Sequence, residues 1–93
     1  TTVDEDALLF VFMLKTIIEP KGYEAYLNII SMSSKMEDYG TALFYAEELL
    51  KIGFADKATL YSLEHTALLR ITPEFNELVT KYLNDARYEI KEQ

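Results

Sequence analysis

The sequence predicts an all-α protein of about five helices that stack as antiparallel pairs. Apolar residues recur at the three- and four-residue spacing of a helix face, most clearly in residues 38–52 and 73–90. The first of these stretches has Asp38 at its start and Gly53 just after its end. Aspartate is typical of helix starts and glycine of helix ends. No stretch alternates strictly between apolar and polar residues, as a half-buried strand would.

Composition limits the possible function classes. The chain of 93 residues, 49% of them hydrophobic, suits a single domain with one core. Sixteen acids against nine bases give a net charge of −7, and lysine and arginine form no cluster. This balance argues against nucleic acid or an anionic membrane as the partner. The absence of cysteine excludes disulfides and thiolate metal sites. We expect a cytoplasmic protein, although an acidic chain fits an exported compartment as well.

The first predicted helix, residues 4–18, is apolar on nearly all sides. Acidic residues at Asp4 to Asp6 suit its start, and Pro20 follows its end. A short buried strand is the alternative, because short apolar runs are ambiguous by periodicity alone. As a helix, the segment needs a contact outside the chain's own core, either an upstream element or a second copy. We therefore expect a docking or oligomer surface at Leu9, Phe10, Phe12 and Met13.

Two further helices are predicted at residues 22–35 and 38–52, after the break at Pro20 to Gly22. The second of them carries an apolar stripe of Tyr39, Ala42, Leu43, Ala46, Leu49 and Leu50. Because Ala42 and Ala46 are small, a neighbouring helix can approach closely at these positions.

The last two helices are predicted at residues 56–70 and 73–90. Asp56 is expected to cap the first of them. Thr72 and Pro73 form a capping hydroxyl followed by proline at the first helical position, which is typical of a helix start.

Shifting the sequence against itself by 35 residues aligns apolar with apolar residues, which indicates a helical repeat. The shift places Ala7 on Ala42, Leu14 on Leu49 and Tyr26 on Tyr61. Helix-pair repeats of about this length are a known architecture.

Part of this pattern resembles a tetratricopeptide repeat (TPR). The residues that carry the resemblance are Asp38, Tyr39, Ala42, Ala46 and Leu49, which are similar to the second helix of that family. Residues 63–75 resemble the degenerate unit that closes bacterial arrays. The resemblance covers residues 23–54, and Ile30 and Ser33 depart from the family's small and aromatic positions. It implies a fragment of a right-handed superhelix, part of a longer chain, with residues 4–18 as the second helix of an earlier repeat.

No residue pattern indicates catalysis. His65 is the only histidine, and no spacing places it beside a nucleophile held by a third group. The acidic pairs lie at helix starts, where capping and solvation explain them, and they lack the spacing of a calcium loop. We therefore expect no enzyme activity, no cofactor and no metal.

The resemblance to the family implies a scaffold that binds a protein or peptide on the concave face of the helices at 22–35 and 56–70. The expected binding residues are Ser31, Lys35, Ser62, Thr66 and Arg70. Lys35 and Arg70, 35 residues apart, would present two cations to a peptide carboxylate. The alternative function is an accessory or oligomerisation domain of an upstream enzyme, docking through residues 4–18.

Overall fold

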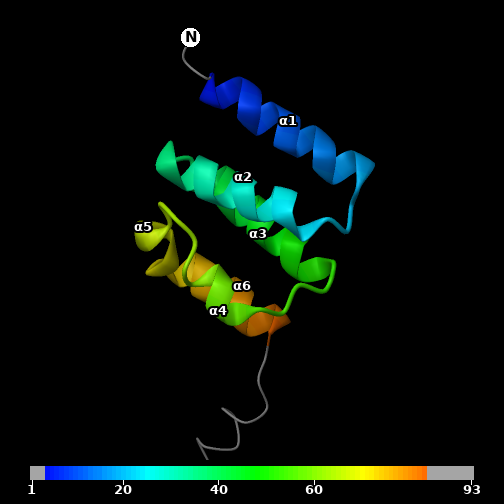
Figure 1. Cartoon of the computed structure of the whole chain (residues 1–93). Helices are drawn as coiled ribbons and strands as arrows, with labels where there is room; N and C mark the ends of the chain where they lie inside the picture. The colour runs from blue at the N-terminus through cyan, green and yellow to red at the C-terminus, as the bar shows by residue number, and fades with distance from the viewer. Residues whose placement is uncertain (1–3, 84–93) are drawn as a thin grey trace, which may run out of the picture.

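The computed structural model describes residues 4–83, and within this range the chain forms six α-helices and no strand, which confirms the all-α fold. Three long helices come first and a shorter, less regular unit follows (Figure 1). Their bounds are α1 Glu5–Ile18, α2 Tyr23–Lys35, α3 Tyr39–Lys51, α4 Lys57–Leu60, α5 Ala67–Arg70 and α6 Pro73–Tyr82. Residues 84–90 of the last predicted helix lie outside the described residues.

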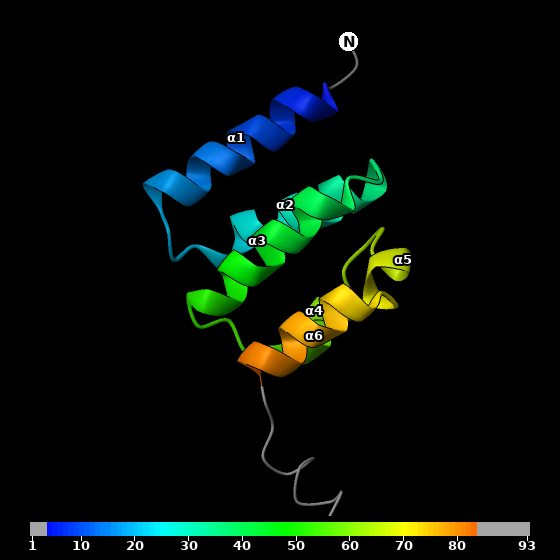
Figure 2. The same cartoon turned by 180° about the vertical axis from the view of Figure 1, so that it is seen from behind.

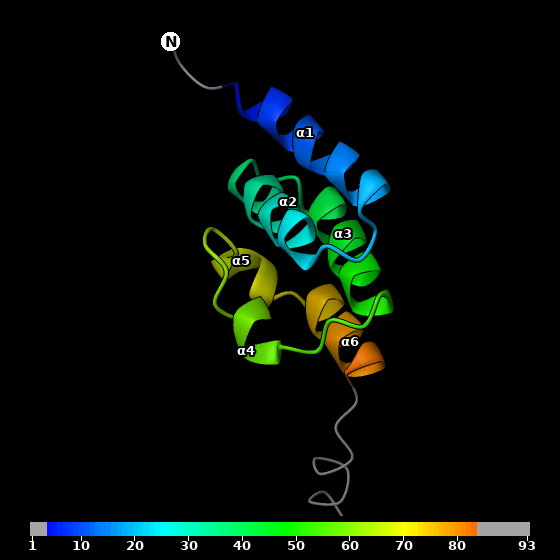
Figure 3. The ribbon, with the colours of Figure 1, turned by 45° about the vertical axis from the view of Figure 1, so that its right-hand side comes forward.

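The helices form layers along the molecule, with α1 at one end, the pair α2 and α3 in the middle and α4 to α6 at the other end (Figure 2). Within these layers, α2, α4 and α5 lie on one side and α3 and α6 on the other (Figure 3). We call the first side the front face and the second the back face. The front face is the one on which the sequence predicts peptide binding.

Side-chain caps fix the starts of four helices. Asp4, Asp38, Asp56 and Thr72 each accept a hydrogen bond from a backbone N–H in the first turn of the helix that follows. The hydroxyl and N–H of Thr59 both donate to Asp56, and these bonds lower the pKa of that carboxyl. From Asp4 to Asp38 and from Asp38 to Thr72 the interval is 34 residues.

The central pair, α2 and α3, supplies most of the core. Ile30 of α2 and Ala42 and Leu49 of α3 have no exposed surface, and Ala46 is 1% exposed. The two helices join through a tight turn in which the N–H of Asp38 donates to the carbonyl of Ser33 at 2.8 Å. These small and branched side chains allow α2 and α3 to pack closely, as the stripe on residues 38–52 predicts.

The predicted continuous helix at residues 56–70 is wrong. The chain forms single turns at α4 and α5, and residues 61–66 between them are not helical. Ser62 and Thr66 turn their hydroxyls back onto the carbonyls of Thr59 and Leu63, at 3.1 and 2.7 Å. Such bonds compete with the helical ladder. His65 completes the break with a left-handed φ of 65°.

The helix α6 closes the stack against α3. Phe75 and Val79 are buried, and Thr72 caps the helix by accepting a hydrogen bond from the N–H of Phe75. At the other end, the hydroxyl of Tyr82 donates to Glu47 of α3 at 2.9 Å. The contact between α3 and α6 therefore combines a buried apolar face with a polar link near the surface.

Replacing Ala46 by leucine tests the close packing in the central pair. Because Ala46 is 1% exposed, the larger side chain has no space, and we expect the free energy of unfolding to fall by about 1–3 kcal/mol. Urea denaturation followed by circular dichroism measures this change. A variant as stable as the natural protein would show that α3 is not packed as described.

Candidate functional site

A pocket of about 460 Å³ opens on the front face, where α1, α2 and the turn at residues 61–66 meet. These segments lie side by side along one edge of the molecule, at the left in Figure 1. Leu8 and Phe12 of α1 and Met32 of α2 form its apolar lining. We call this cavity the front pocket.

The polar lining of the front pocket comes from three segments. Its members are Asn28, Ser31 and Lys35 of α2, Glu5 of α1, and Glu64 and His65 of the turn. The positions on α2 follow helical spacing, which places all three on one side of that helix. A ligand in the pocket would therefore meet apolar and hydrogen-bonding groups together.

Two of the five predicted binding residues, Ser31 and Lys35, line the front pocket. Lys35 is exposed, and its Nζ forms an ion pair with Glu5 Oε2 at 2.7 Å. The hydrogen bond to Glu5, and then the charge of that carboxylate, raise the pKa of Lys35. Lys35 is therefore cationic at neutral pH, but a ligand carboxylate would compete with Glu5 for it.

The other three predicted residues are not part of the pocket lining. Ser62 is exposed and donates its hydroxyl to the carbonyl of Thr59. Thr66 is 1% exposed and its hydroxyl is bonded to Leu63, so the structure does not present it to a ligand.

The pair of cations expected from Lys35 and Arg70 is not formed. The Arg70 guanidinium donates from Nη1 to the carbonyl of Tyr61, and from Nε to the carbonyl of Thr66 at 3.2 Å. These bonds hold the non-helical turn together, and Arg70 does not line the front pocket. The expectation assumed that residues 56–70 were helical and repeated the arrangement of α2.

Sequence reasoning missed most of the pocket lining. Leu8 and Glu5 belong to a helix that was assigned to docking, and Glu64 and His65 belong to a turn that was predicted as helix. Asn28 lies three residues before Ser31 and seven before Lys35, so helical spacing could have identified it as a third residue on the same side of α2. No sequence pattern predicted which side of α1 would face these residues.

The predicted docking residues of α1 do not share one surface. Leu9 is 8% exposed, Phe12 and Met13 are half-buried, and Phe10 is 59% exposed. Leu9 lies on the buried side of α1, which packs against α2. The exposed apolar side of the helix consists of Phe10, Val11, Leu14, Ile17 and Ile18.

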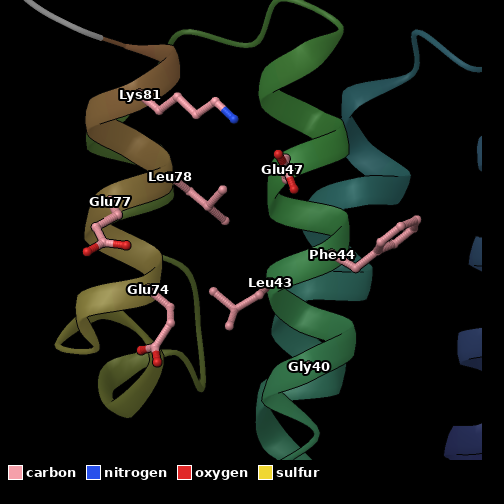
Figure 4. A pocket seen from close by; sticks show the side chains of 8 residues that line it. All are labelled: Gly40, Leu43, Phe44, Glu47, Glu74, Glu77, Leu78 and Lys81. Atoms are coloured by element: carbon pink, nitrogen blue, oxygen red, sulfur yellow. The ribbon is translucent and has the colours of Figure 1, made fainter.

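A second groove, of about 440 Å³, lies on the back face between α3 and α6. Leu43 and Leu78 point toward one another across it, whereas Phe44 points away from α6 (Figure 4). Three carboxylates and one cation surround this apolar centre: Glu47, Glu74, Glu77 and Lys81. Glu47 already accepts the hydrogen bond from Tyr82, so part of the rim serves the contact between the helices.

Residues 4–83 contain no group of three histidine, cysteine, aspartate or glutamate side chains placed to hold a metal ion. Within the same residues, no helix is both long enough and apolar enough to cross a membrane. No family model, curated protein sequence or solved structure matches the chain.

Proposed function

We propose that the chain is a protein-binding scaffold module that holds a peptide segment in the front pocket. The observation that carries this proposal is the composition of the pocket. Leu8, Phe12 and Met32 offer an apolar surface next to the polar Ser31 and the exposed cation of Lys35. Apolar lining with a few polar groups that orient the ligand is typical of binding sites.

The pocket favours a particular kind of peptide. An apolar side chain of the ligand fits against Leu8, Phe12 and Met32, and an acidic group of the same ligand pairs with Lys35. The ligand acid replaces Glu5 as the partner of Lys35, so one exposed ion pair is exchanged for another. We therefore expect the apolar contact to supply most of the affinity and the charge to supply specificity.

The arrangement of the helices supports a scaffold similar to the TPR family. Caps recur at 34-residue intervals at Asp4, Asp38 and Thr72, which matches the length of a repeat in that family. The front pocket is lined in part by α2. By the resemblance, α2 is the first helix of its repeat. On this reading α3 supports α2 from behind (Figure 3).

Peptide selection tests the proposal. Peptides chosen from a random phage-displayed library on the immobilised protein should contain an apolar residue near an acidic one. Fluorescence polarisation with a selected synthetic peptide should show that Lys35→Glu and Ser31→Arg each weaken binding by about tenfold or more, because they remove the cation and fill the pocket.

The matched control is Lys81→Glu, which makes the same charge change on the back face. Its affinity should equal that of the natural protein, because Lys81 does not line the front pocket. Equal binding by all three variants, or a larger loss with Lys81→Glu, would remove the front pocket as the binding site. Circular dichroism of each variant should show unchanged helicity.

A further inference from the structure

The outer side of α1 exposes an unusual amount of apolar surface. Ile17 and Ile18 are 73% and 76% exposed, Phe10 is 59%, Val11 is 47% and Leu14 is 41%. Monomeric soluble proteins rarely expose contiguous apolar patches of this kind without a partner. We call these five side chains the outer stripe.

The outer stripe is a continuous surface. At about 100° per residue, Phe10, Leu14 and Ile17 fall in a row along the helix, with Val11 and Ile18 beside them. The residues of α1 that are buried, Leu9 and Thr16, lie on the other side of the helix. The packing of α1 against α2 therefore leaves the whole outer stripe open.

We propose that the outer stripe binds the same surface of a second copy of this chain, with the two α1 helices antiparallel. The stripe is centred on Leu14, so a twofold axis there places Phe10 opposite Ile18 of the other copy. All five apolar side chains then face apolar side chains. The pairing is self-complementary, as an interface between two identical subunits requires.

The charges at the ends of α1 favour the antiparallel orientation. Three acids lie at the start of α1, namely Asp4, Glu5 and Asp6, whereas its end carries a net positive charge from Lys15, Glu19 and Lys21. An antiparallel pair brings the acidic start of one helix to the basic end of the other, whereas a parallel pair would place the two acidic starts together. Helix dipoles favour the same choice.

The size of the contact predicts weak association. A helix of 14 residues is about 21 Å long, and one helix–helix contact buries less than the roughly 800 Å² per partner of a standard interface. We therefore expect a dimer with a dissociation constant on the order of 100 μM. This inference does not depend on peptide binding in the front pocket, because the two surfaces lie on different sides of α1.

Sedimentation equilibrium over a range from about 10 μM to about 1 mM tests the dimer. The natural protein should pass from monomer to dimer over this range. Ile17→Lys should remain monomeric, because it places a charge opposite the apolar Val11 of the other copy. The control Phe44→Lys changes a similarly exposed apolar residue on α3 and should dimerise normally.

Single cysteine variants test the orientation, because the natural chain contains no cysteine. In the antiparallel pair, two molecules of the Leu14→Cys variant should form a disulfide with each other under mild oxidation. An equal mixture of Phe10→Cys and Ile18→Cys should give mainly the mixed disulfide. A natural protein that stays monomeric at about 1 mM, or Phe10→Cys that pairs only with itself, would overturn the proposal.

Discussion

Replacing Phe75 by alanine should lower the free energy of unfolding by about 3–5 kcal/mol. Phe75 is 1% exposed, and its ring packs edge-on against Tyr61 with 5.3 Å between ring centroids. The truncation removes this contact and leaves a cavity in the main core, which the surrounding structure fills only in part. Because a domain of this size has a total stability of about 5–15 kcal/mol, the loss would be a large share of it.

Urea denaturation followed by circular dichroism measures this effect, and Phe44→Ala is the matched control. Phe44 is 56% exposed, so its truncation should change the free energy of unfolding by no more than about 0.5 kcal/mol. Equal effects of the two substitutions would show that α6 does not pack on the rest of the stack as described.

Replacing Leu69 by alanine should cost about 2–5 kcal/mol. Leu69 has no exposed surface and belongs to the main core, although it lies in α5, which is a single helical turn. Short helices of this kind are not stable alone, so tertiary packing must hold the segment. The substitution therefore measures how firmly the irregular segment 57–70 is attached to α3 and α6.

The adjacent residue supplies the control. Leu68 has the same chemistry but is 60% exposed, so Leu68→Ala should change the free energy of unfolding by no more than about 0.5 kcal/mol. The same urea denaturation compares the two variants. A small effect of Leu69→Ala would mean that residues 57–70 are only loosely attached, and the turn that lines the front pocket would lose its support.

The regular helices could be predicted from sequence because each carries two independent signals. α3 has a cap at Asp38 and an apolar stripe through Ala42, Ala46 and Leu49, and all of these residues have the expected roles. α6 has the Thr72 cap and the buried Phe75. Local capping and helical periodicity agree in these segments, so the pattern specifies the structure.

The segment 56–70 shows where such signals fail. Asp56 does cap a helix, and Leu60 is buried, but Leu69 is buried as well. One continuous helix would place Leu69, nine residues after Leu60, on its opposite side. The helix is interrupted by hydroxyl-to-carbonyl bonds from Ser62 and Thr66, and by the left-handed His65. Periodicity of apolar residues does not detect these bonds, because serine and threonine occur within helices as well.

The front pocket could be predicted only on the side that α2 supplies. The resemblance to the TPR family implied that Ser31 and Lys35 face a binding groove, and both line the front pocket because helical spacing keeps them on one side of α2. The contribution of Glu5 and Leu8 depends on how α1 packs. Because α1 is apolar on nearly all sides, its sequence did not indicate which side would be buried. The role of Arg70 depends on the backbone carbonyls of a turn that the sequence pattern did not reveal.

The most direct test of the proposed function is to map where a peptide binds. Two-dimensional amide NMR spectra of the labelled protein, recorded during titration with a peptide selected on it, should show the largest shifts at Ser31, Lys35 and His65 in the front pocket. Largest shifts at Leu43 and Leu78 in the back groove, or on the outer stripe of α1, would contradict the account.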